Sequence, residues 1–250
     1  YEIPSMFIYN AVCVMSDLTT SKAGTITSGE DRFMEWKTTD GSYENTQYAA
    51  FDTFFEGLFE KNRFLDILKN FICFNVDGEK TFKVLAAYHQ YFAVKKAIAS
   101  TQKATVTDGK GGVFWHTQGS GKSYSMVFLA QKIRRKFSGS PTIIVLTDRD
   151  ELNKQISATF ESCGCLNGMK SSTFVPSSGA RLVEMLKGNP SYIFTLIQKF
   201  NNDHPDPITP NHDIIIMSDE AHRTQNGLFA DNMMKLLPTD SRIGFTGTPL

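Results

Sequence analysis

The sequence lacks several features that would place it in an easily recognised class. Its 26 basic and 26 acidic residues cancel to a net charge of zero, so any nucleic-acid binding must come from a local patch rather than from bulk charge. No apolar run approaches the roughly 18 to 20 residues that cross a bilayer, and the start of the chain has no signal-peptide pattern. The four cysteines include Cys163 and Cys165, which are too close for an easy mutual disulfide and lack zinc-site partners. We therefore predict reduced thiols in a cytoplasmic protein without a membrane partner.

The first 112 residues of the 250-residue chain differ in texture from the remainder. Residues 1–40 mix short apolar runs with Thr-, Ser- and Gly-rich sequence, which predicts short strands and loops. Aromatic residues at helical spacing over residues 51–74 predict core-facing helices. A further helix is expected over residues 80–100, followed by a polar, Gly-rich linker over 101–112. The chain ends at Leu250 without a polar tail, so we expect a piece of a longer protein.

From Gly112 onwards, short apolar runs alternate with amphipathic segments. This alternation predicts a parallel sheet covered by helices on both faces, that is, an α/β fold. The expected strands are residues 113–116, 142–147, 192–197, 213–218 and 242–246, and the expected helices are residues 121–137, 150–162, 179–188 and 225–236.

The segment HTQGSGKS lies between an expected strand and an expected helix. A phosphate-binding loop needs small residues whose backbone N–H groups face phosphate oxygens, a lysine for the β and γ oxygens, and a hydroxyl for Mg²⁺. His116 stands where this motif usually has its first glycine, so a Gly-rich turn is the alternative. The candidate phosphate contacts are Thr117, Gln118, Gly119, Ser120, Gly121, Lys122 and Ser123.

Two adjacent carboxylates, Asp219 and Glu220, follow the expected strand that ends at Ser218. Because the carboxyl ends of parallel strands gather on one edge of a sheet, Asp219 can face the same nucleotide as Lys122. Asp219 would then hold Mg²⁺ with Ser123, while Glu220 orients and deprotonates the attacking water. The alternative is an acidic pair that caps the following helix.

Five segments occur in the order and spacing of superfamily-two helicases and translocases, and together they resemble the motor (R) subunit of type I restriction-modification enzymes. They are HTQGSGKS, VLTDRDEL, TLIQKF, DEAH and TGTP, at residues 116–123, 145–152, 195–200, 219–222 and 246–249. The resemblance spans nearly the whole chain. It implies a RecA-like parallel sheet flanked by helices, the first helicase motor domain, preceded by a helical segment and a short α+β remnant of a nuclease domain.

The resemblance also implies ligands and site residues. ATP and Mg²⁺ would be the cofactors. Gln90 matches the family's glutamine motif and would read adenine, since an amide donates and accepts at once. Residues that would couple the nucleotide site to the DNA track are His222, Thr246 and Thr248. Loop residues that would bind phosphates of double-stranded DNA are Thr147, Arg149, Gln198 and Lys199.

The implied organisation has three parts: a nuclease-domain remnant over residues 1–40, a helical connector over 41–110, and the first RecA-like ATPase domain over 111–250. The expected partners are duplex DNA, the methyltransferase and specificity subunits, and a second motor domain of the same subunit. Without that second domain we expect weak nucleotide binding and little hydrolysis. Asp17, Glu35 and Lys37 have the spacing of nuclease residues. The family resemblance, however, aligns this part of the chain with sequence after the nuclease signature, so we do not assign them that role.

Other readings stay open on the residues alone. Another superfamily-two DNA helicase would share these motifs. A P-loop NTPase or phosphotransferase acting on a soluble substrate would need the phosphate loop, yet it would not require the TGTP segment. A nucleotide-binding module without turnover is a third alternative. DNA-stimulated ATP hydrolysis separates the motor from the other two.

Overall fold

The structure is a computed structural model that describes residues 4–7, 9–42, 50–117, 119–202, 205–221 and 227–248. The chain divides into two compact units, Tyr1–Lys95 and Lys96–Leu250, and the division falls within helix α3 (Tyr88–Ala104). The finer boundaries expected at residues 40 and 110 stay predictions. Within the described ranges, no helix combines the length and apolar character needed to cross a membrane.

The first unit begins with the short strands expected for residues 1–40. A short 3-10 helix, η1 (Pro4–Phe7), precedes β1 (Cys13–Ser16) and β2 (Ser21–Gly24), which pair antiparallel. A single bridge then joins Ala23 to Met34, after the 3-10 helix η2 (Glu30–Arg32). The hydroxyl of Thr25 donates to the Lys83 carbonyl at 2.7 Å. This bond ties the N-terminal strands to a segment far along the chain.

Helices α1 (Phe51–Phe59) and α2 (Lys61–Asn70) confirm the predicted helices for most of the aromatic stretch. The prediction is wrong for its last residues, since 72–74 belong to a strand. Phe54 and Leu58 of α1 are fully buried. Glu60 begins α2, because its carboxylate accepts from the backbone N–H groups of Asn62 and Arg63. The buried Trp36 ring packs against α3 residues, with ring centroids 5.8 Å from Tyr91 and 6.0 Å from Phe92. These contacts form an aromatic core for the first unit.

The prediction of one helix over residues 80–100 is wrong in its first part. Strands β3 (Ile72–Asp77) and β4 (Lys80–Leu85) form an antiparallel hairpin, and α3 begins only at Tyr88. Asp77 pairs with Lys80 across a two-residue turn in which Gly78 has a φ of +58°. An Asp-Gly pair between strands is a strong hairpin signal. The expected linker over 101–112 is wrong too, since α3 runs to Ala104 and β5 (Lys110–Trp115) begins before its end.

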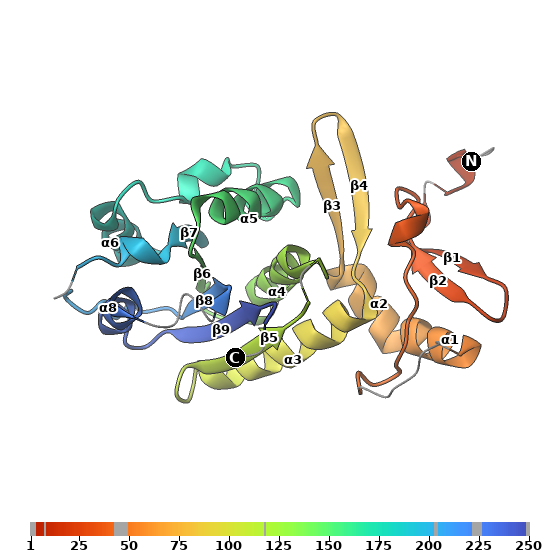
Figure 1. The fold of residues 1–250 in the computed structure, drawn as a ribbon, viewed down its shortest axis with the longest axis horizontal. Coiled ribbons are helices and arrows are strands. Elements are labelled where there is room, and N and C mark those ends of the chain that lie inside the picture. The colour runs from red at the N-terminus through yellow and green to blue at the C-terminus, as the bar shows by residue number, and fades with distance from the viewer. Residues whose placement is uncertain are drawn as a thin grey trace. The chain divides into compact units, whose positions relative to one another are not determined.

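The second unit contains a five-stranded parallel sheet within the described residues. Its strands are β5, β6 (Thr142–Thr147), β7 (Tyr192–Leu196), β8 (Ile214–Asp219) and β9 (Ser241–Thr246), in the spatial order β5-β9-β8-β6-β7 (Figure 1). Every neighbouring pair is parallel. The carboxyl ends of all these strands therefore lie at one edge, which confirms the predicted α/β class.

Helices cover both faces of this sheet, which explains why β6 and β8 are buried along their whole length. On one face, Phe160 packs edge-on against Tyr192 and Phe194. On the other face, Leu182 and Met233 join the core cluster of the sheet. The helices are α4 (Lys122–Lys136), α5 (Asp150–Ser162), α6 (Gly179–Lys187) and α8 (Leu228–Leu236), and the short 3-10 helices are η3 (Ser171–Phe174) and η4 (Ile197–Lys199).

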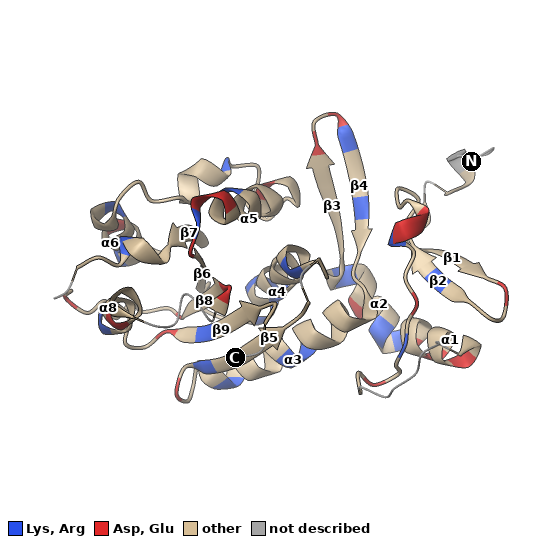
Figure 2. Cartoon of the chain, in the orientation of Figure 1, with Lys and Arg blue, Asp and Glu red and all other residues tan. Residues whose placement is uncertain are grey.

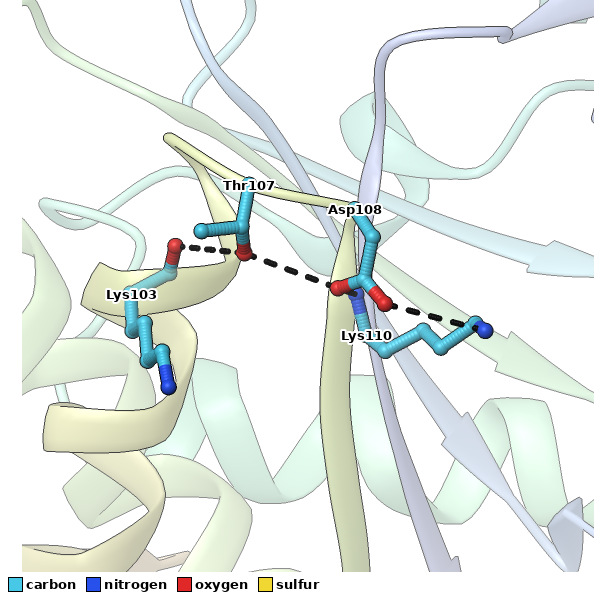
Figure 3. Close-up of polar contacts among 4 residues, drawn as sticks. All are labelled: Lys103, Thr107, Asp108 and Lys110. Atoms are coloured by element: carbon cyan, nitrogen blue, oxygen red, sulfur yellow. Dashed lines mark hydrogen bonds and ion pairs between the residues drawn. The ribbon is translucent and has the colours of Figure 1, made fainter.

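The connection from α3 to β5 is a compact polar turn (Figure 3). Thr107 donates its hydroxyl to the Lys103 carbonyl at 2.9 Å, and Asp108 accepts from the backbone N–H of Lys110 at 3.1 Å. Gly109 follows with a φ of +73°, and a Cβ there would lie 2.4 Å from the Asp240 carbonyl oxygen. Only glycine allows that close approach. The turn thus fixes where β5 starts against β9.

Candidate functional site

The segment HTQGSGKS connects β5 to α4 as a tight, glycine-dependent loop. The Thr117 carbonyl accepts from both the backbone N–H and the hydroxyl of Ser120, at 3.2 and 2.7 Å. Gly119 and Gly121 both have a φ of +81°, in the left-handed region that favours glycine. Gln118 lies outside the described residues. The loop therefore has the turn geometry expected of a phosphate cradle.

His116 packs against an aromatic residue of β5. This contact explains why a large side chain is tolerated at a position where the motif usually has glycine. Its ring lies edge-on to Phe114, with ring centroids 4.5 Å apart, and Phe114 stacks on Phe245 of β9 at 4.8 Å. The backbone N–H of His116 donates to the Thr246 carbonyl at 3.1 Å. The imidazole thus extends the aromatic core of β5 and β9.

Helix α4 starts directly after the loop, with Gly121 as its N-cap and Lys122 as its first residue. The first N–H groups of a helix have no partner within the helix, and its dipole favours an anion there. The first turn of α4, which the structure describes completely, contains no acidic residue that could take that place. A strand, a loop with two left-handed glycines and a helix N-terminus together form the expected geometry of a phosphate site.

Asp219 lies at the end of β8, on the same sheet edge as the loop. Strand β9 lies between β5 and β8, and its Phe245 pairs with both Phe114 and Asp219. Asp219 is only 7% exposed. Burial raises the pKa of its carboxyl, and the neighbouring Glu220 raises it further, whereas the Glu220 backbone N–H and the Lys122 ammonium lower it. Burial is thus the main influence on this carboxyl, and the charge of Lys122 opposes it.

Glu220 has a backbone φ of +47°, which is uncommon for a residue with a side chain. The extended conformation of β8 therefore ends directly after Asp219. Figure 2 shows acidic residues at this end of β8 and at the start of α5. The arrangement gathers negative charge at the edge where the phosphate loop supplies positive charge.

The expected coupling residues are described in part. Thr246 is fully buried at the end of β9, where its hydroxyl donates to the Thr248 carbonyl at 3.0 Å and accepts from the Thr248 backbone N–H at 3.3 Å. This turn closes the strand beside the phosphate loop, since Thr246 pairs with Trp115. His222 lies outside the described residues. The coupling role of all three residues stays a prediction.

These residues fit a Mg²⁺-bound nucleoside triphosphate. No group of three His, Cys, Asp or Glu side chains in the described ranges is arranged to hold a metal ion by itself. Mg²⁺ typically takes only one or two protein oxygens and completes its shell with phosphates and water. The Ser123 hydroxyl at the start of α4 and the Asp219 carboxylate are oxygen donors of that kind. A Cβ at Gly119 would meet no described atom within 4 Å, so the loop leaves open space beside its backbone.

Gln90 is buried rather than exposed, in the first turn of α3. Its side-chain carbonyl accepts from the backbone N–H of Ala87 at 2.9 Å, and this bond caps the helix. The sequence did not indicate this local role. Adenine recognition by Gln90 stays a prediction.

The four residues expected to bind DNA lie at the carboxyl ends of the neighbouring strands β6 and β7 and around the loops that follow them. Thr147 is the last residue of β6, Arg149 precedes α5, and Gln198 and Lys199 belong to η4. Gln198 donates from Nε2 to the Asp148 carbonyl at 2.9 Å, so the structure brings the two loops together. The Arg149 side chain is 57% exposed. Thr147 is fully buried, with its hydroxyl directed to the Arg149 carbonyl at 3.4 Å, so it shapes the loop instead of facing solvent. Lys199 donates to the Pro176 carbonyl.

Asp148 is a site residue that the sequence analysis missed. Its side chain is 14% exposed and lies 3.6 Å from Arg149, measured from Oδ2 to Nε. Its charge contributes to raising the pKa of Asp219. A carboxylate directly after the apolar strand β6 was the available signal, because that strand neighbours β8 in the sheet.

The residues with nuclease-like spacing make local contacts. Lys37 pairs with Glu35 at 3.1 Å. Asp17 accepts from the backbone N–H groups of Thr20 and Thr19, at 2.6 and 3.0 Å, and those bonds lower the pKa of its carboxyl. These contacts give Asp17 a turn-forming role.

The family model for the SWI2/SNF2 ATPase matches residues 89–250, so the chain belongs to the SWI2/SNF2 ATPase family. The match covers the HTQGSGKS, DEAH and TGTP segments completely.

Within that family the chain resembles the endonuclease subunits of type I restriction enzymes. It is 36% identical to the type I restriction enzyme HindI endonuclease subunit of Haemophilus influenzae and 34% identical to the putative MjaIXP endonuclease subunit of Methanocaldococcus jannaschii. Both alignments cover 100% of this chain and 26% of the relative, so the chain spans about a quarter of their length. The resemblance inferred from the motifs is confirmed.

Solved structures of similar fold include the UvsW helicase from bacteriophage T4, at 14% identity and a TM-score of 0.47, covering 75% of this chain and 60% of that one. Another is the ATP-dependent type ISP restriction-modification enzyme LlaBIII bound to DNA, at 16% identity and a TM-score of 0.47, covering 69% of this chain and 13% of that one.

Proposed function

We propose that this chain is the ATP-binding motor region of a type I restriction enzyme endonuclease subunit, hereafter the parent subunit. In the parent subunit it binds ATP with Mg²⁺ and duplex DNA, and ATP hydrolysis drives translocation before cleavage. The observation that carries this proposal is the placement of the phosphate loop and Asp219 at one edge of a parallel sheet. Similarity over the whole of this chain to a quarter of two restriction enzyme endonuclease subunits supports the substrate assignment.

The residues have distinct roles in this proposal. The backbone N–H groups of the loop and of the first turn of α4 bind the phosphates, and Lys122 neutralises the β and γ oxygens. Ser123 and Asp219 hold Mg²⁺, which offsets the charge that develops on the transferred phosphoryl group. Glu220 orients the attacking water and accepts its proton. Gln90 recognises adenine through its amide.

Translocation requires parts beyond this chain. A second motor domain of the parent subunit would supply cationic side chains for the transition-state charge and close over the nucleotide. Residues 1–250 alone would therefore bind nucleotide weakly and hydrolyse little of it. The methyltransferase and specificity subunits would supply target recognition, and the complex would act in the cytoplasm. The DNA loops bind phosphates, so they would follow the backbone without reading bases.

The test is Lys122→Ala in the parent subunit, with Lys136→Ala as the matched control. Both residues lie on α4, Lys122 at its start and Lys136, which is exposed, at its end. We expect Lys122→Ala to lower DNA-stimulated ATP hydrolysis at least 100-fold, whereas Lys136→Ala behaves like wild type. Comparable turnover in wild type and Lys122→Ala would refute the phosphate-loop assignment. Hydrolysis that DNA does not stimulate in the wild type would instead favour an NTPase acting on a soluble substrate.

A further inference from the structure

Asp148 contacts two residues proposed to bind DNA. It also follows a strand that neighbours β8, where Asp219 is proposed to hold Mg²⁺. Its carboxylate is 3.6 Å from the Arg149 guanidinium, and its carbonyl accepts from Gln198. Both partners are residues proposed to bind DNA phosphates. The 57% exposed Arg149 side chain can reach solvent, while the 14% exposed Asp148 side chain stays largely shielded from it.

The sheet order places the segment that carries Asp148 next to the end of β8, where Asp219 lies. Leu146 pairs with Ser218, so the chain after β6 leaves the sheet next to the chain after β8. Asp219 directly follows Ser218, and Asp148 comes after the last paired residues of β6, so the two carboxylates belong to neighbouring strand ends. A largely buried charge is weakly screened by salt, so its effect reaches this neighbour.

We propose that Asp148 is a positioning residue that couples DNA binding at Arg149 to Mg²⁺-nucleotide binding at Asp219. This inference rests on the proposed function. In the DNA-free state Arg149 offsets the Asp148 charge. A DNA phosphate competes for the same guanidinium, because planar guanidinium groups bind phosphate and carboxylate alike. The Asp148 charge is then less compensated, and the added negative potential favours Mg²⁺ at the adjacent edge.

The coupling is reciprocal: if one ligand raises the affinity for a second, the second raises the affinity for the first by the same factor. DNA raises the affinity for the Mg²⁺-nucleotide, and the Mg²⁺-nucleotide raises the affinity for DNA. An ion pair with one exposed partner contributes at most about 1 kcal/mol, which corresponds to about fivefold in affinity. We therefore expect a coupling of about threefold.

The experiment compares Asp148→Asn with Asp150→Asn in the parent subunit. Asp150 is a matched control, because it lies two residues along, is exposed, and pairs with Lys154 on α5 at 2.6 Å. Fluorescence anisotropy of a labelled DNA duplex gives the DNA affinity with and without Mg²⁺ and a non-hydrolysable ATP analogue. Wild type and Asp150→Asn should bind DNA about threefold more tightly with the Mg²⁺-analogue, whereas Asp148→Asn should show no change.

A second variant, Arg149→Gln, keeps the inference testable if Asp148→Asn does not fold. It removes the cation and leaves the Asp148 charge uncompensated, so without DNA it should bind the Mg²⁺-analogue about threefold more tightly than wild type. Coupling retained in Asp148→Asn, coupling lost equally in Asp150→Asn, or unchanged analogue affinity in Arg149→Gln would each overturn the inference. If the wild type shows DNA-stimulated ATP hydrolysis, a failed coupling test refutes only the role of Asp148. If the wild type shows no DNA-stimulated ATP hydrolysis, the proposed function itself is refuted.

Discussion

Replacing Gly119 with alanine separates the conformational cost of the phosphate loop from its role in binding. Gly119 has a φ of +81°, and an added Cβ meets no described atom within 4 Å. In the folded state, alanine at this position is therefore destabilised only by its left-handed backbone conformation, by roughly 1–2 kcal/mol. The alanine-containing unfolded chain is more restricted, which offsets about 0.4–1 kcal/mol. We expect a net loss of about 1 kcal/mol and a melting temperature about 2–4 °C lower.

The effect on nucleotide binding should be larger, because the methyl group projects into the open space beside the loop backbone. A phosphate displaced from one backbone N–H loses a hydrogen bond to a charged group, about 1.5–3 kcal/mol. That corresponds to about 10- to 150-fold weaker binding. Equilibrium titration of the parent subunit with a fluorescent ATP analogue measures the affinity, and a thermal scan measures the stability.

Gly139→Ala is the matched control. Gly139 has a φ of +79°, an added Cβ there also meets no described atom within 4 Å, and the residue lies beyond the opposite end of α4. It should lose the same stability and bind nucleotide like wild type. Wild-type affinity in Gly119→Ala, or an equal loss in both variants, would show that the loop backbone does not bind the phosphates.

Three further predictions concern stability. Asp219→Asn should stabilise the protein by about 1 kcal/mol at neutral pH in thermal scans, because burial raises the pKa of Asp219. This gain in stability should shrink as pH falls, since the wild-type carboxyl then takes up its proton. A gain that does not change with pH would contradict this cause. Gly57→Ala should lower the free energy of unfolding in urea by about 1–3 kcal/mol, although alanine favours helices. The cause is steric, since the added Cβ would lie 2.2 Å from Cδ1 of Trp36. An unfolding midpoint at a higher urea concentration than in wild type would refute this prediction. Hydrogen bonds from the backbone N–H of Ser171, and next from the Lys170 ammonium, lower the pKa of Glu161 from 4.5 to about 2. Glu161→Gln should therefore be less stable at neutral pH, and the difference in stability should fade as pH drops from 4.5 towards 2.

Much of the second unit could be predicted from hydrophobic pattern alone. Strands buried on both faces give continuous apolar runs, and β6 was placed with the bounds that the structure has. The β3–β4 hairpin was missed because Phe82 and Val84 also fit helical spacing with the residues that follow. The turn at Gly78, an Asp-Gly pair, was the local signal that outweighed that periodicity.

The candidate site divides in the same way. That β5, which leads to Lys122, and β8, which ends at Asp219, share one edge follows from the parallel sheet. The burial of Thr147 and Gln90 could not be predicted, because burial of a loop or first-turn side chain depends on tertiary packing. Asp148 was overlooked because its proposed role depends on β8 being the neighbour of β6. The order of strands in a sheet cannot be predicted from the local sequence.

Strand β9 has a consequence for how the two halves of the site can vary. It separates β5 from β8 by two interstrand spacings, about 10 Å. That width is set by main-chain ladders, so it is insensitive to side-chain identity in the core. Substitutions in the core can therefore leave unchanged the distance between the two strand ends that carry the proposed phosphate loop and Asp219.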